Sequence, residues 1–213
     1  MDGTLVPNMS YHSRAFDVQA ERHGYKLREP VDGRYFGWHK CDVMRAVVDK
    51  EICDKFGVEF LADEKEAIYR ELYAPYADLT PGLRPLIAEA KSLGIGCAIG
   101  SAAPQENVDF IIDATDISDL MEVVVSGNDV KNCKPDPEIF LTCCERLGVE
   151  PSDCIVFEDA VSGVRAGVSA GCKVIAIATN TAAELLRESG AHLVVDTFEQ
   201  MTIEGLERSL FGE

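Results

Sequence analysis

The sequence predicts an α/β protein with a Rossmann-like, doubly wound parallel sheet as its core and a helical domain inserted near the N-terminus. Short apolar runs alternate with helical patterns from about Thr80 onward. Several of these runs are too uniformly apolar to have a solvent-facing side, which favours strands covered on both faces. Strands that alternate with helices of this length imply right-handed crossovers, and therefore parallel strands.

The α/β region is expected to alternate strands and helices in a fixed order. The expected strands are residues 95–100, 121–126, 154–157, 173–178 and 192–195. The expected helices, recognised by apolar residues at helical spacing, are residues 82–93, 104–114, 137–147, 161–170 and 181–188. Gly163, Gly167 and Gly171 recur every four residues along and just past one helix, which predicts close packing of that helix on the sheet.

Residues 9–78 have a different pattern, because they contain no clear strand. Their segments 11–23, 43–56 and 64–76 are helical patterns with a polar face. We therefore expect a helical cap domain at residues 9–78, inserted after the first strand and joined by two passages to a core domain of residues 1–8 and 79–213.

The composition excludes several classes of protein. A chain of 213 residues with 46% hydrophobic residues can bury a sizeable core. Its net charge of −17 disfavours sequence-independent attraction to nucleic acids and anionic membranes. No apolar run approaches the roughly 18 residues of a membrane span, and the N-terminus has no secretory signal pattern. We expect a cytoplasmic monomer without nucleic-acid or membrane partners.

The eight cysteines raise the question of disulfides or a zinc site. No pair has C-x-x-C spacing, and most of the cysteines lie within apolar segments. The sequence therefore favours buried, reduced thiols that pack as small hydrophobic side chains.

Chemistry-bearing residues occur where a parallel α/β sheet binds its ligands, beyond the carboxyl ends of the strands. Each has an ordinary structural explanation when taken alone: a turn, a helix start or a helix cap. The four short elements are Asp2-Gly3-Thr4, Ser101 after the run 95–100, Lys134-Pro135-Asp136-Pro137 before a helix, and Glu158-Asp159 at the end of the run 154–157.

Together and in this order, the four elements resemble the motifs of the haloacid dehalogenase (HAD) superfamily. The resemblance is to the members with a helical cap, the β-phosphoglucomutase-like phosphatases and mutases, and it covers the whole chain except a first strand. It implies that the attacking aspartate lies just before Met1. Asp2 would match the second aspartate, which protonates the leaving oxygen and later deprotonates the incoming hydroxyl, while its backbone carbonyl binds Mg²⁺.

The resemblance also implies roles for the other motif residues. Glu158 and Asp159 would supply oxygen ligands to Mg²⁺, the expected cofactor. Ser101 would donate a hydrogen bond to the phosphoryl group, with the backbone N–H of Ala102 beside it. Lys134 would pair with the nucleophile and the phosphate, offsetting charge in an anionic site.

Three residues of the expected cap are candidates for substrate binding. His12 and Lys40 stand where related mutases have a substrate-contacting histidine and an arginine for the distal phosphate, and Trp38 could form a wall for a sugar. Each also has a simpler interpretation. The histidine and the tryptophan could serve packing alone, and the lysine could be solvated.

The sequence departs from the mutase pattern in ways that favour hydrolysis. Ala103, Pro104 and Gln105 stand where the mutases have a serine, a lysine and an asparagine around the phosphates, and Pro7 and Asn8 replace an aspartate and a hinge threonine. A bisphosphate intermediate needs firm binding at both ends. The first hypothesis is therefore a Mg²⁺-dependent phosphatase acting on a small phosphorylated metabolite, a sugar or polyol phosphate, through an aspartyl-phosphate.

Two alternatives remain open at this point. One is a β-phosphoglucomutase. The other is a non-catalytic remnant that binds phosphometabolites or a protein partner, if the polypeptide truly starts at Met1. Because the expected first strand would lie in the middle of the sheet, we favour a recorded start that omits the first residues. A chain that begins at Met1 is expected to lack phosphatase turnover.

Overall fold

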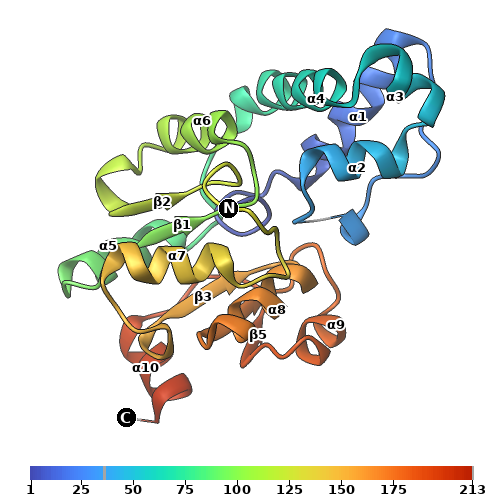
Figure 1. Cartoon of the computed structure of the whole chain (residues 1–213). Coiled ribbons are helices and arrows are strands. Elements are labelled where there is room, and N and C mark those ends of the chain that lie inside the picture. Colours follow the sequence, from blue (N-terminus) through green and yellow to red (C-terminus); the bar gives the residue numbers. More distant parts are fainter. Residues whose placement is uncertain (36, 213) are drawn as a thin grey trace.

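The computed structural model describes residues 1–35 and 37–212. Helices α1 to α4 gather at one end of the molecule, and the strands with the later helices form the other end (Figure 1). The helices of the first end, called here the helical unit, are α1 (Met9–His23), α2 (Lys40–Val47), α3 (Lys50–Phe56) and α4 (Val58–Tyr73). The later helices are α5 (Leu83–Ser92), α6 (Gln105–Thr115), α7 (Glu138–Leu147), α8 (Val161–Ala170), α9 (Ala183–Glu188) and α10 (Ile203–Phe211).

The strands are short and all their pairings are parallel. They are β1 (Ala98–Gly100), β2 (Val123–Val125), β3 (Ile155–Glu158), β4 (Lys173–Ile177) and β5 (Leu193–Val195). The α/β fold with parallel strands is thus confirmed. Within the described residues, however, the hydrogen-bond ladders form two sheets, β1–β2 and β3–β4–β5, where we expected one.

Some expected element boundaries were wrong, for local reasons. The run 95–100 is only half strand, because Ile95 N donates to Ala90 O (2.9 Å) and so closes the end of α5. The expected helix 43–56 is two helices. Val48 and Asp49 between them have extended ψ angles of 140° and 141°, which a continuous helix cannot contain. The helix expected at 64–76 begins earlier, at Val58, and ends at Tyr73.

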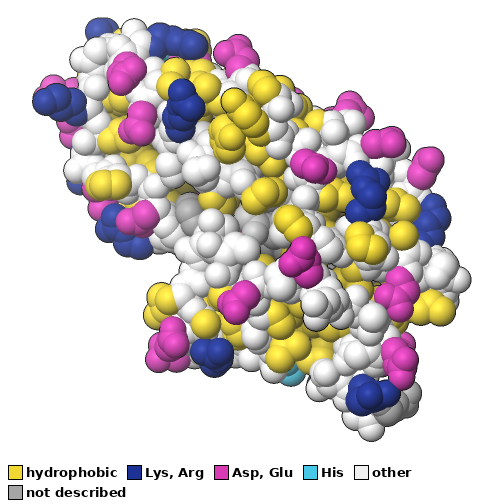
Figure 2. Space-filling model, turned by 180° about the vertical axis from the view of Figure 1, so that it is seen from behind, with side chains coloured by type: hydrophobic (Ala, Val, Ile, Leu, Met, Phe, Trp, Pro, Cys, Tyr) yellow, Lys and Arg dark blue, Asp and Glu magenta, His cyan; other side chains and the backbone are white. Residues whose placement is uncertain are grey.

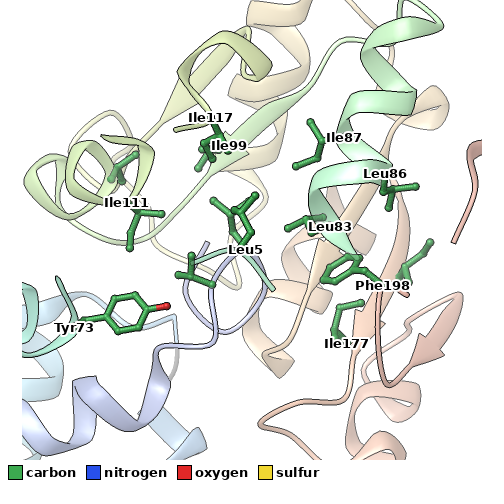
Figure 3. Packing of buried hydrophobic residues seen from close by; sticks show 14 of the residues in the cluster. Leu5, Tyr73, Leu83, Leu86, Ile87, Ile99, Ile111, Ile117, Ile177 and Phe198 are labelled. Carbon is green, nitrogen blue, oxygen red and sulfur yellow. The ribbon is translucent and has the colours of Figure 1, made fainter. Parts of the chain in front are cut away.

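A hydrophobic cluster fills the space between the two sheets. Leu5, from the N-terminal turn, lies between Ile99 of β1 on one side and Leu83 and Phe198 on the other (Figure 3). Leu5 is also tied to the chain that returns from the helical unit, since Thr80 N donates to Leu5 O (2.9 Å). The N-terminal turn is thereby fixed at the centre of the α/β part.

The helical unit has a hydrophobic cluster of its own. Phe16 of α1, Met44 of α2 and Leu61 of α4 are buried in it, and α1 packs along α4. The burial of these side chains against one another stabilises the packing of α1, α2 and α4 within the helical unit. The boundaries of the cap domain, 9–78, remain a prediction.

The glycines of α8 pack as the sequence predicts. A Cβ atom at Gly167 would lie 2.8 Å from Val174 Cγ2 and 3.3 Å from Val156 Cγ1, so α8 sits directly on β3 and β4. The expected helix 161–170 is confirmed, with Gly171 ending it in the left-handed region at φ 89°.

Replacing Gly167 with alanine is expected to destabilise the protein by about 1–3 kcal/mol, because the added methyl overpacks the contact with Val174. Urea unfolding measures this change. Gly205→Ala in α10 is the control. A Cβ there would lie 3.1 Å from Oγ1 of the exposed Thr202, which can shift slightly, so alanine's higher helix propensity should keep the change close to neutral. A Gly167→Ala variant as stable as the wild type would contradict close packing of α8 on the sheet.

The remaining expectations concern cysteines and surface charge. All eight cysteines are free thiols, and Cys41, Cys53, Cys143, Cys144 and Cys172 are buried. The prediction of buried cysteines holds for these five, whereas Cys97, Cys133 and Cys154 are partly exposed. In the part of the chain that the structure describes, no helix is both long and apolar enough to cross a membrane. Acidic and basic side chains are interspersed over the face shown in Figure 2.

Candidate active site

A cavity of about 130 Å³ lies between the helical unit and the carboxyl ends of β1 and β3. The predicted site residues come from distant parts of the chain, yet the structure places all of them in the walls of this one cavity. They are Asp2, His12, Trp38, Lys40, Ser101, Ala102, Lys134, Glu158 and Asp159.

Ser101 follows β1 directly and is held by its backbone. Its N–H donates to Val125 O of β2 (2.9 Å), which continues the ladder by one residue. Its Oγ accepts a hydrogen bond from Ala103 N (3.2 Å), so the hydroxyl sits within the turn before α6. The serine is almost fully buried. Its hydroxyl proton is still available for a ligand oxygen.

Asp159 is a buried carboxylate beside the N-terminal turn. Thr4 Oγ1 and Asn180 Nδ2 each donate to it at 3.1 Å. Gly3, at φ 71°, makes this close approach possible, because a Cβ there would lie 1.9 Å from Asp159 Oδ2. Burial, together with the negative charge of Glu158, raises the pKa of Asp159 to about 6.

Lys134 forms a buried ion pair with Glu158, and its Nζ also donates to Gly100 O (3.2 Å). Lys134 lies in the loop before α7. Its Nζ is 4.7 Å from the ring centroid of Phe140, which is in that helix. Gly163 of α8 makes room for the Glu158 carboxylate, since a Cβ there would lie 2.2 Å from its carbon. We predicted that Lys134 pairs with the nucleophile and phosphate; here its acidic partner is Glu158.

The Asp2 carboxylate contacts the start of the helical unit. Asn8 Nδ2 donates to its Oδ1 (2.5 Å), and His12 Nε2 lies 3.6 Å from the same oxygen. Burial alone would raise the pKa of Asp2, but the interactions with His12, with the positive charge of the Met1 amino group and with Asn8 outweigh it and hold the pKa below its usual range. Asp2 is therefore a carboxylate in this state.

Asn8 is a site residue whose role the sequence did not reveal. It is fully buried, and besides Asp2 it contacts Tyr69 OH (2.6 Å) and accepts from Gly3 N (3.1 Å). The sequence showed it only as a departure from a hinge threonine. Its amide fixes both the side chain of Asp2 and the turn that carries it.

His12 is held in place rather than exposed. Its ring stacks on Tyr69 with centroids 3.7 Å apart, and Lys65 Nζ lies 3.1 Å from its Nδ1. An ammonium group only donates, so Nδ1 accepts and the ring proton is on Nε2, toward Asp2. His12 Nε2 makes no hydrogen bond within the described residues.

Lys65 and Glu66 of α4 also line the cavity, and sequence analysis missed both of them. Lys65 Nζ lies 2.8 Å from Glu66 Oε1, and the side chains are only 7% and 8% exposed. Asn107 of α6 donates to Glu66 Oε2 (2.8 Å) and accepts from Arg70 (2.6 Å), so the group bridges α4 and α6. No local pattern signals these contacts, because a Lys-Glu pair on a helix is ordinarily solvated.

Trp38 and Lys40 stand at the opening of the cavity. Trp38 is 46% exposed and meets Tyr35 edge to face, with centroids 5.5 Å apart. Lys40, at the start of α2, forms an ion pair with Asp63 of α4. A Cβ at Gly37 would lie 2.5 Å from Ser162 Oγ, so this loop rests against the start of α8.

The donor set fits a magnesium ion in its chemistry. Glu158 and Asp159 are adjacent buried carboxylates. The pKa of Asp159 is raised first by burial and then by the like charge of Glu158, and a bound cation would oppose both effects. Carboxylate and carbonyl oxygens are the ligands that Mg²⁺ prefers. Among side chains in residues 1–35 and 37–212, no group of three or more His, Cys, Asp or Glu is arranged to hold a metal. A site would also need the backbone carbonyl of Asp2 and water.

Comparisons with known proteins agree with the sequence motifs. The sequence model for haloacid dehalogenase-like hydrolases matches residues 1–171. The phosphorylated carbohydrates phosphatase of Thermotoga maritima is 31% identical over 209 residues, covering 95% of this chain and 94% of that protein. Hexitol phosphatase A of Escherichia coli is 30% identical over 210 residues, covering 95% and 91%. A crystal structure of β-phosphoglucomutase from Clostridium difficile superposes with a TM-score of 0.82 at 26% identity, covering 99% and 94%.

Proposed function

The chain belongs to the haloacid dehalogenase-like hydrolases, and we propose that it hydrolyses the phosphomonoester of a small sugar or polyol. Its relatives in this family include phosphatases and a phosphoglucomutase. One observation carries the proposal: Asp2, Ser101, Lys134, Glu158 and Asp159 converge on a single cavity at the carboxyl ends of two strands. The names of the carbohydrate and hexitol phosphatases support the substrate class.

In the proposed reaction, the protein first positions the phosphoryl group. The Ser101 hydroxyl and the Ala102 N–H would donate to its oxygens, and the Lys134 ammonium would offset their charge. The nucleophile we propose is an aspartate directly before Met1, where the Asp-x-Asp pattern places it. Its attack on phosphorus would give an aspartyl-phosphate and release the substrate oxygen.

Asp2 would carry the protons in both halves of the reaction. As an acid it gives a proton to the leaving oxygen, and as a base it takes one from the water that attacks the aspartyl-phosphate. Its ionised state here, with its oxygen held by Asn8, corresponds to the second half. A Mg²⁺ ion bound by Glu158, Asp159 and the Asp2 carbonyl would supply Lewis-acid stabilisation of phosphoryl charge.

The helical unit would act as a cap that sets the substrate. It supplies the upper wall of the cavity through α1, α2 and α4, with His12 and Trp38 among the lining residues. Closure of such a unit excludes water and completes a site in many enzymes.

A second candidate, β-phosphoglucomutase, is favoured by the structural similarity to that enzyme. Its chemistry requires capture of a second phosphate while the aspartyl-phosphate is protected from water. Ala102, Ala103 and Pro104 line the cavity at the turn before α6 and offer no side-chain donor. Hydrolysis is therefore the primary proposal.

We expect release of inorganic phosphate from several sugar phosphates to exceed conversion of β-glucose 1-phosphate to glucose 6-phosphate. The protein is made with the codons upstream of Met1 that complete the motif, and a coupled assay with glucose 1,6-bisphosphate as activator measures both products. Formation of glucose 6-phosphate about ten times faster than free phosphate would establish the mutase instead. The same chain started at Met1 is the paired control and is expected to show no turnover.

A further inference from the structure

The helical unit offers two lysines to the cavity, and each already has an acidic partner. Lys40 pairs with Asp63, and Lys65 pairs with Glu66. His12 also stands beside carboxylates, because its Nδ1 lies 3.8 Å from Glu66 Oε2 and its Nε2 lies 3.6 Å from Asp2 Oδ1. Among the described residues that line the cavity from the helical unit, no lysine or arginine lacks a carboxylate partner.

The Lys65–Glu66 pair is held by its neighbours. Lys65 Nζ donates to Glu66 Oε1 (2.8 Å), lies 3.1 Å from His12 Nδ1, and is 4.9 Å from the ring centroid of Phe16. The other oxygen of Glu66 accepts from Asn107. Because both side chains are more than nine-tenths buried, water screens their mutual attraction poorly, and each charge cancels most of the other's field.

A neutral donor–acceptor pair and an unpaired cation select different ligands. A hydroxyl group can both donate and accept, so it can bind Glu66 and Lys65 together. A phosphate group could accept from Lys65 but would be repelled by the Glu66 carboxylate, one oxygen of which lies 2.8 Å from the Lys65 ammonium. The phosphate-binding elements, Ser101 and Lys134, lie on the α/β side of the cavity.

We propose that Glu66 is a specificity-determining residue: by neutralising Lys65, it makes the helical-unit side of the cavity a hydroxyl-binding subsite. The enzyme then accepts monophosphates of polyhydroxy compounds and rejects substrates that carry a second phosphate. This inference rests on the proposed function, since it names the substrate class of the same site.

The first test uses the protein without substitutions, made with the codons upstream of Met1 as above; this protein is the wild type in all the tests. Its kcat/KM for a hexitol 6-phosphate should exceed that for glucose 1,6-bisphosphate by about tenfold or more, the effect of one charge-assisted contact. A wild-type preference for the bisphosphate would overturn the proposal whatever the variants do.

The second test removes only the charge of Glu66. Glu66→Gln keeps the shape and the acceptor oxygen but frees the charge of Lys65, so kcat/KM for the bisphosphate should rise about tenfold through a lower KM. The value for the monophosphate should fall by about threefold to tenfold, because the substrate hydroxyl then donates to a neutral amide oxygen instead of a carboxylate. Glu66→Asp, which retains the charge, should keep the wild-type preference. Glu64→Gln is the matched control on the same helix, because Glu64 pairs with His23 and Arg22 and does not line the cavity.

The outcomes separate this inference from the function on which it rests. If the wild type hydrolyses monophosphates but Glu66→Gln leaves the ratio unchanged, the role of Glu66 is wrong and the phosphatase remains. If the wild type hydrolyses no monoester, the proposed function fails. In that case, calorimetry in Mg²⁺-free buffer can still measure the binding of the hexitol 6-phosphate and of glucose 1,6-bisphosphate. If the ratio of the two affinities is the same in the wild type and in Glu66→Gln, the proposed role of Glu66 is refuted.

Discussion

Replacing Asp159 with asparagine should make the metal-free protein more stable at neutral pH while removing the Mg²⁺-dependent activity that we propose. The pKa of Asp159 is raised to about 6 in the folded state, so ionisation of this carboxyl group lowers the free energy of unfolding. Asparagine removes that charge but loses part of the hydrogen bonding with Thr4 and Asn180. We expect a net gain of about 1–2 kcal/mol in the free energy of unfolding.

The pH dependence of this difference has a definite sign. A carboxyl group whose pKa is raised by folding stabilises the fold while it is protonated, and this stabilisation is lost as the pH rises through about 6. The advantage of Asp159→Asn should therefore be largest above pH 6 and vanish below 3.8, the ordinary value for an aspartate. Urea unfolding in EDTA across this range measures it.

Activity and metal binding complete the test of Asp159. Turnover should fall by about 10³-fold or more, and added Mg²⁺ should stabilise the wild type but not the variant. Asp113→Asn, at an exposed position on α6, is the control and should change neither property. Undiminished turnover in Asp159→Asn, or in excess EDTA, would show that the metal assignment is wrong.

Replacing Lys134 with methionine should destabilise the protein by about 3–5 kcal/mol. The change leaves the Glu158 carboxylate buried without its cationic partner, and both side chains are at most 7% exposed. The double variant Lys134→Met/Glu158→Gln removes both charges and should recover most of the loss, because a neutral pair of similar size carries no uncompensated charge. Urea unfolding of the wild type and the three variants of this cycle measures the coupling.

An exposed ion pair provides the matched control for Lys134. Lys50 pairs with Asp54 on α3 at 86% exposure, so Lys50→Met should change stability by less than about 0.5 kcal/mol. Added Mg²⁺ should lessen the loss in Lys134→Met if the ion binds Glu158. A loss below about 1 kcal/mol in Lys134→Met would contradict the buried pair.

Features that depend on short stretches of chain were predictable from the sequence. The helix 161–170 was correct at both ends, because its apolar spacing and its closing glycine are local signals. The motif residues Ser101 and Glu158 were found for a similar reason: each ends an apolar run, and parallel strands bring such ends to one edge.

Features that depend on which segments meet were decided only by the tertiary structure. Asn8, Lys65 and Glu66 carry no distinctive sequence pattern, and Glu66 meets Asn107 across 41 residues of chain. The division of the strands into two sheets likewise depends on which backbones come within hydrogen-bonding reach.

The sequence by itself determined the periodicity, the parallel α/β architecture and the types of reactive side chain, because these follow from local spacing and chemistry. The charge balance of the cavity was decided by the fold. Lys65 and Lys134 are neutralised because each has a carboxylate within about 4 Å. At that distance in a poorly screened interior, the carboxylate determines the net charge of the pair that a ligand would contact.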